Sequence, residues 1–132
     1  MSNVRALLAL GLLALSSAAS AANPPPGVWA NPANSVHVTF KRCGQAICGT
    51  VIWANPKAQA DAARGGTDHL VGQLLFHDFV ESGKGRWNGQ VLVPDIGQSV
   101  TGTITLVDAH TLVGEGCVMK GFGCKSQTWK KI

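Results

Sequence analysis

Short runs in which apolar and polar residues alternate constrain the fold of this chain more than any other feature of its 132 residues. In residues 36–41, Val36, Val38 and Phe40 share one face of an extended strand, and polar residues take the other face. Residues 100–106 repeat the pattern with threonines on the polar face. The further strand candidates are residues 47–53, 74–80, 87–93, 112–118 and 127–132. Several short strands separated by turns are typical of an all-β sandwich or an antiparallel barrel.

One segment breaks this alternation and predicts a short helix or helical loop after the third strand. Asn55 can cap the helix, Pro56 fits its first position, and Gly65 can end it. We therefore expect a helix from Pro56 to Arg64. Turn-forming residues at positions 81–85, 94–97 and 108–110 separate the later strands.

Glycines share a strand face with large apolar residues in four of the strand candidates. These glycines are Gly49, Gly89, Gly102, and the pair Gly114 and Gly116. A glycine that faces inward either lets the strand coil sharply, as a small barrel requires, or leaves space beside a bulky neighbour. The sequence leaves two alternatives for the interior of the barrel. The four tryptophans can fill the spaces and give a solid core, or the glycines can line a ligand cavity.

The first 22 residues have the anatomy of a secretory signal. Arg5 supplies a positive charge, residues 6–15 are apolar, and a run of small residues ends at Ala22. The apolar run is shorter than the roughly 18 residues that a transmembrane anchor needs. We expect cleavage near Ala21/Ala22, one domain over residues 23–132, no membrane span in the mature chain, and a periplasmic or secreted location.

The four cysteines agree with export, because disulfides persist in oxidising compartments. Four cysteines allow three pairings. Turn residues lie inside each sequential pair, and cysteines facing each other across a hairpin meet the geometry of a disulfide. Pairing of Cys43 with Cys48 and of Cys117 with Cys124 is therefore favoured. Structural zinc prefers tighter cysteine spacing, so we expect no metal site.

Composition and motifs argue against several classes of function. Charged residues make up 14% of the chain, and its net charge of +4 is not gathered into the basic, aromatic-interleaved stripe typical of nucleic-acid binding. Acidic residues and histidines are close in sequence at Asp68-His69, His77-Asp78 and Asp108-Ala109-His110. Neighbours on a regular strand point to opposite faces, so His77 and Asp78 are not expected to pair. We assign no catalytic residue and expect no cofactor, and enzymatic activity stays open.

A set of motifs spread along the chain has a recognisable order and spacing. It comprises Gly27-x-Trp29, Lys41-Arg42-Cys43-Gly44, Cys48-Gly49, Ile52-Trp53, Gly72, Trp87-x-Gly89, Val93-Pro94-Asp95-x-Gly97, Thr111-Leu112, Gly116 and Gln127-Thr128-Trp129-Lys130. The set resembles the bacterial secreted domain-of-unknown-function family numbered 2147. The resemblance implies a small lipocalin-like antiparallel barrel of about eight strands, exported and without an established activity. This chain departs from many members in two ways. It has no tyrosine, and it retains only Asp61 of the acidic loop that many members have after the third strand.

The implied barrel predicts how its two ends are built. Its first and last strands must pair for the barrel to close without edges, so we expect Trp29 and Trp129 to pack together at a closed end. A cation over such a tryptophan, as in lipocalins, could come from Lys130, Lys131 or Arg42.

Two functional hypotheses follow from the implied fold. In the first, the protein is a binding module for a small apolar or amphipathic ligand in the bacterial envelope. The ligand sits in the barrel mouth under residues 55–70 and is lined by Trp53, Phe76, Phe79 and Trp87. In the second, the barrel has no interior ligand and binds or inhibits another envelope protein through its loops. A cavity favours the first hypothesis and a packed interior favours the second.

Overall fold

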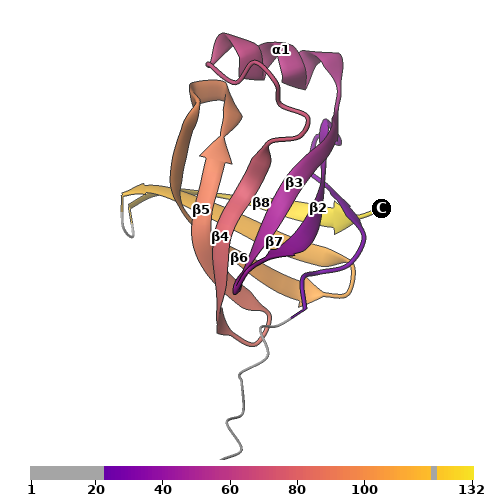
Figure 1. Cartoon of the computed structure of the whole chain (residues 1–132), viewed down its shortest axis with the longest axis vertical. Coiled ribbons are helices and arrows are strands. Elements are labelled where there is room, and N and C mark those ends of the chain that lie inside the picture. The colour runs from indigo at the N-terminus through magenta and orange to yellow at the C-terminus, as the bar shows by residue number, and fades with distance from the viewer. Residues whose placement is uncertain (1–22, 120–121) are drawn as a thin grey trace, which may run out of the picture.

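The chain folds into a closed antiparallel barrel of eight strands, each paired with the next along the sequence (Figure 1). The computed structural model describes residues 23–119 and 122–132, so the predicted signal segment lies outside the described residues. The strands are β1 (Val28–Ala30), β2 (Val36–Cys43), β3 (Ala46–Ala54), β4 (Leu74–Gly83), β5 (Arg86–Val93), β6 (Gln98–Asp108), β7 (Thr111–Met119) and β8 (Phe122–Lys131). The predicted all-β barrel is confirmed, and the alternative sandwich is wrong.

Strand β8 begins earlier than its sequence pattern predicted. The alternation pointed to a start at Gln127, whereas the strand begins at Phe122. Its backbone stays in register with β7 throughout, so that Cys117 lies opposite Cys124 and Gly116 lies opposite Lys125. A strand paired along its whole length on one side does not need a strictly alternating sequence, because its partner satisfies its backbone groups.

Both predicted disulfides are confirmed, and each joins neighbouring strands. Cys43 and Cys48 bridge the β2–β3 hairpin, and Cys117 and Cys124 bridge β7 and β8. All four cysteines are used in these two bonds. The second bond joins β7 to β8 near the open end of the barrel.

The predicted helix is confirmed as α1 (Pro56–Arg64). The Asn55 side-chain oxygen accepts a hydrogen bond from the Ala58 amide at 2.8 Å, which satisfies one of the free amides of the first turn. At the other end, the Gly65 amide donates to the carbonyl of Ala62. Helix α1 crosses one end of the barrel (Figure 1). Within the part of the chain that the structure describes, no helix is long and apolar enough to span a membrane.

A tight joint links the end of α1 to the short 3-10 helix η1 (Pro94–Ile96). A Cβ atom on Gly65 would overlap the backbone of Asp95, so the two segments meet at a distance that only glycine allows. The Thr67 hydroxyl donates a hydrogen bond to the Pro94 carbonyl at 2.9 Å. The joint fixes α1 and η1 together above the barrel end.

The barrel closes where β1 meets β8, as predicted. Trp29 lies opposite Lys131, and Ala30 lies opposite Lys130. The register places Lys131 on the same side of the sheet as Trp29, and the aliphatic carbons of Lys131 cover Gly27. Of the three candidate cations at this end, Lys131 is thus the one aligned with Trp29.

The two tryptophans that were expected to pack together belong to one core cluster. Trp29 is completely buried. The ring that Trp129 contacts is that of Phe76, edge-on with 5.6 Å between the ring centres. Trp129 therefore extends the core from the closing strands toward the middle of the barrel.

The closed end of the barrel is filled with side chains. Phe79, Ile104 and Leu112 are fully buried there. A Cβ on Gly49 would lie 2.7 Å from Phe76 and 2.9 Å from Phe40, so the two rings already occupy the space beside this glycine. In this half of the barrel, the solid-core interpretation of the inward glycines is correct.

Trp29→Ala should lower the free energy of unfolding by about 3–5 kcal/mol, because it removes a fully buried aromatic ring from the closing strand. Urea titration followed by circular dichroism measures the loss. Trp53→Ala is the matched control, because Trp53 is 43% exposed and its loss should cost less than about 1 kcal/mol. Equal losses in the two variants would contradict the assignment of Trp29 to the barrel seam.

Candidate ligand-binding cavity

The half of the barrel beneath α1 contains a cavity of about 830 Å³, within the range typical of small-molecule sites. Leu75, Phe76 and Trp129 line its inner part, where it meets the packed core. Val91 and Leu92 of β5 form a second apolar wall. The interior is therefore packed at one end and open at the other.

The glycines of β7 keep one wall of the cavity free of side chains. Gly114 and Gly116 both line it. A Cβ on Gly114 would lie 3.5 Å from Phe76 and 3.5 Å from Trp129, which is ordinary van der Waals contact. A Cβ on Gly102 would instead overlap a Val91 methyl group and lie 2.7 Å from the Glu115 carbonyl oxygen. A small side chain at Gly114 would thus fit without overlap, whereas the space beside Gly102 is occupied.

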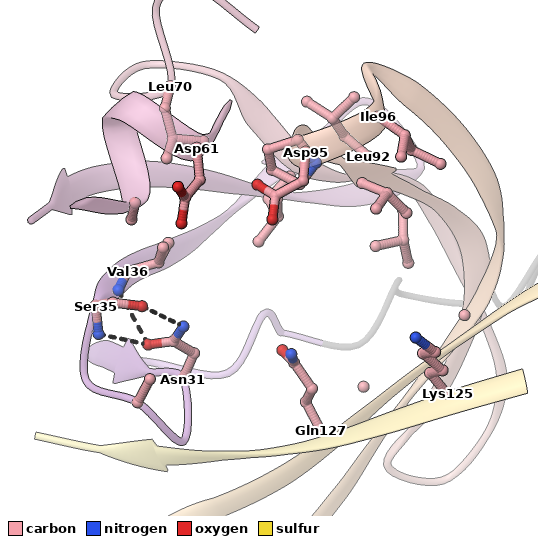
Figure 2. A pocket seen from close by; sticks show the side chains of 18 of the residues that line it. Asn31, Ser35, Val36, Asp61, Leu70, Leu92, Asp95, Ile96, Lys125 and Gln127 are labelled. Carbon is pink, nitrogen blue, oxygen red and sulfur yellow. Dashed lines mark hydrogen bonds between the residues drawn. The ribbon is translucent and has the colours of Figure 1, made fainter. Parts of the chain in front are cut away.

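Polar side chains are gathered at the mouth of the cavity. Figure 2 shows Lys125 and Gln127 projecting from β8, with Asp61 of α1 and Asp95 of η1 on the opposite side. The Asn31 side chain stabilises the turn at a third point of the rim, where its oxygen accepts hydrogen bonds from the amides of Ser35 and Val36. The site therefore combines an apolar interior with a charged rim.

Asp61 is held as a carboxylate by two cations on its own helix. The Lys57 amino group donates a hydrogen bond to it at 2.6 Å, and Arg64 bonds to its other oxygen. The Lys57 hydrogen bond is the main reason that the pKa of Asp61 lies below its usual value, and the positive charges of both cations add to the effect against the opposing contribution of burial. The negative charge of Asp61 is thus already compensated.

Of the four side chains predicted to contact a ligand, the structure brings Phe76 to the cavity, where it is 2% exposed. Phe79 and Trp87 are buried in the core and do not line the cavity. Trp53 lies on the outer surface, with its ring centre 4.4 Å from that of His37. Ligand contact by these residues stays a prediction, and Phe76 alone of the four is placed to make it from the cavity wall.

Two irregularities in the strands account for the positions of Trp53 and Phe79. Val38 lies opposite Val51 and His37 lies opposite Trp53, so Ile52 is an extra residue that turns Trp53 outward. In β4, Asp78 has a φ of 56°, and the register shifts after His77. A prediction that assumes strict alternation along each strand misses both changes of face.

Sequence reasoning missed Lys125 and Gln127, which line the cavity. Both occupy alternate positions before Trp129 on β8, so they share its inward face. This periodicity is the signal that the sequence offers for Gln127. Lys125 lies before the predicted start of the strand at Gln127, whereas the observed strand begins at Phe122.

A histidine, a serine and an aspartate meet on the outer wall. His77 Nε2 lies 3.1 Å from the Ser99 hydroxyl oxygen, and His77 Nδ1 lies 3.7 Å from an Asp78 carboxylate oxygen. The irregular backbone at Asp78 explains why these neighbours approach, in contrast to the expectation for a regular strand. None of the three residues lines the cavity, and 3.7 Å is too long for the hydrogen bond that orients a catalytic histidine.

One group of potential metal ligands occurs among the described residues. Donor atoms of Glu115, Cys117 and Cys124 lie within 4.8 Å of one another. The two sulfurs are bonded to each other as a disulfide, and the thiolate form of cysteine is the form that binds metals. The group therefore offers a single carboxylate in the oxidised protein.

A closed eight-stranded antiparallel barrel with a helix over one end and a cavity beneath it defines a lipocalin-like class of fold. Over residues 27–131 the chain matches, and belongs to, the bacterial family DUF2147, described as uncharacterized proteins conserved in bacteria.

The fold is also found in a solved structure of HP1028 from Helicobacter pylori, a protein described as belonging to the lipocalin family. The two chains superimpose with a TM-score of 0.60 and 16% sequence identity over 84% of each chain. Comparison with curated proteins gives no match. At this level of identity the likeness concerns the fold alone.

Gly102→Ala and Gly114→Ala should differ in stability, because the added methyl group overlaps a Val91 methyl group and a backbone carbonyl at Gly102, whereas at Gly114 it lies at ordinary contact distance from Phe76 and Trp129. We expect the Gly102 variant to lose about 1–3 kcal/mol and the Gly114 variant to remain within about 1 kcal/mol of the wild type. Urea unfolding of both variants measures the difference. Similar losses would mean that the wall at Gly114 is as tightly packed as the wall at Gly102.

Proposed function

We propose that the protein binds a small apolar or amphipathic molecule in the cavity beneath α1. The observation that carries this proposal is the contrast within one barrel between a filled end and an open space of about 830 Å³. An empty apolar space forfeits the dispersion contacts of its lining side chains, and a ligand would restore them. A mainly apolar pocket with a few polar groups at its edge is the usual design of a small-molecule site.

The segment over the mouth supports the same proposal. Residues 55–70 were expected to cover it, and Asn55, Ala58 and Leu70 from this segment do line the cavity. The joint of Gly65 with Asp95 and the hydrogen bond of Thr67 to Pro94 hold this cover against the barrel. A cover built this firmly fits a site that shields its ligand from water.

Residues 27–131 belong to a family without an assigned activity, and the lipocalin likeness is one of fold. Fold likeness alone does not assign function, so the proposal rests on the cavity. Binding or inhibition of another envelope protein through the loops is the second candidate. It is favoured by exposed apolar side chains in and beside one loop: Val71 in the segment between α1 and β4, Leu74 at the start of β4, and Ile52 and Trp53 near the end of β3.

The binding proposal predicts saturable quenching of tryptophan fluorescence by dodecanol, a neutral amphiphile. Emission comes from the four tryptophans, because the chain has no tyrosine, and Trp129 lines the cavity. We expect a Kd of about 1–100 μM, or roughly 5.5–8 kcal/mol, for the burial of one alkyl chain.

Gly114→Leu should occupy the inner part of the cavity beside Phe76 and Trp129, where a ligand chain would lie, and abolish this quenching. Gly83→Leu is the matched control, because a side chain at Gly83 meets no atom within 4 Å and Gly83 ends β4 away from the cavity. A wild-type titration that stays flat to the solubility limit would contradict ligand binding and would favour the protein-binding candidate.

We also propose that the protein works in the bacterial envelope after removal of residues 1–22. The two disulfides support an oxidising compartment, and the N-terminal pattern supports export. The intact mass of protein recovered from the periplasm or medium of a bacterial host should correspond to a chain that starts near Asn23. A full-length mass in the cytoplasmic fraction with four alkylatable thiols would refute export.

A further inference from the structure

Most polar side chains at the cavity mouth already have partners within the protein. Asn31 bonds to Ser35 and Val36, and Asn55 caps α1. Asp61 is paired with Lys57 and Arg64. Within residues 23–119 and 122–132, by contrast, the side chains of Lys125 and Gln127 make no hydrogen bond or ion pair. These two groups are therefore available to a ligand.

The strand register gives these two side chains free space on the inner wall. Lys125 lies opposite Gly116, and Gln127 lies opposite Gly114, so neither has a cross-strand side chain beside it. Both stand on the same face as Trp129, which lies about 13 Å from Lys125 along β8 at the usual rise of an extended strand. From the rim inward, the wall thus changes from an ammonium group to an amide and then to an aromatic ring.

One cation and one carboxylate at the mouth have no partner on the cavity wall. Of the four charged residues that line the cavity, Lys57 and Asp61 are bound to each other, which leaves Lys125 and Asp95. Figure 2 shows Asp95 on the η1 side of the opening and Lys125 on the β8 side. The free cation on β8 therefore lies next to an amide donor and glycines, on the wall where a ligand tail would contact Trp129.

We infer that the ligand is a single-chain amphiphile with an anionic head group, which accepts hydrogen bonds from the Lys125 amino group and the Gln127 amide while its tail lies against Phe76 and Trp129. This inference rests on the proposed function and names its ligand class. Lysine carries donors only, and an amide beside it can donate to a second oxygen, so the pair matches a carboxylate, sulfate or phosphate head. The apolar interior beyond Gln127 matches an alkyl chain.

Three amphiphiles with the same alkyl chain test the inference: dodecanoate, dodecanol and dodecyltrimethylammonium. The two ions are titrated below their micelle concentrations and dodecanol below its solubility limit, and binding is followed by tryptophan fluorescence. We expect dodecanoate to bind about tenfold more tightly than dodecanol, because its carboxylate accepts a charge-assisted hydrogen bond from Lys125. A bond of this kind at a hydrated rim contributes about this much affinity. Raising the salt concentration from about 0.05 M to about 0.5 M should weaken dodecanoate binding and leave dodecanol binding unchanged, because salt screens exposed charges.

Lys125→Met should remove the preference for dodecanoate and leave the affinity for dodecanol unchanged. Lys84→Met is the matched control, because Lys84 lies in the β4–β5 turn, outside the cavity lining, and should keep the preference. Lys125→Glu should make dodecyltrimethylammonium the tightest of the three ligands.

Equal binding of all three amphiphiles to the wild-type protein would overturn the head-group assignment and leave the proposed function intact. Tightest binding of dodecyltrimethylammonium to the wild type would overturn it in favour of a cationic head beside Asp95. No binding of any of the three would instead refute the proposed function itself.

Discussion

Backbone pairing of β1 with both β2 and β8 holds the barrel closed, and the cavity depends on it. β1 spans Val28–Ala30, and its central residue Trp29 is fully buried between the two neighbouring strands. Without this pairing, β2 and β8 would present open edges. The wall of β7 and β8, which carries Gly114 and Lys125, would then no longer face α1 across the cavity.

Inside the closed barrel, glycine has two opposite consequences that depend on its neighbours. At Gly49 and Gly102, neighbouring side chains from other strands fill the space that the missing Cβ leaves. At Gly114, the nearest rings stop at ordinary contact distance, and the space toward the mouth stays open. The barrel is therefore packed at one end and hollow at the other.

Local signals made most of the fold predictable. Asn55, Pro56 and Gly65 marked both ends of the helix, and turn residues inside each cysteine pair favoured the observed disulfides. The site was less predictable because it depends on strand register. An extra residue at Ile52 turns Trp53 outward, and the irregular backbone at Asp78 changes the faces of β4, although neither position has a distinctive sequence pattern. Whether an inward glycine borders a ring or a void depends on residues far away in the sequence, so the cavity could not be inferred from alternation.

A crystal structure can show whether an apolar ligand chain occupies the open half of the barrel with its head group at the β8 rim. The ligand for this experiment is ω-bromododecanoate, because the anomalous signal of bromine locates the end of the chain. We expect a bromine peak inside the barrel beside Phe76 and Trp129, with the carboxylate next to Lys125. A bromine peak on the outer wall near Trp53, or a filled interior with no ligand density, would contradict it.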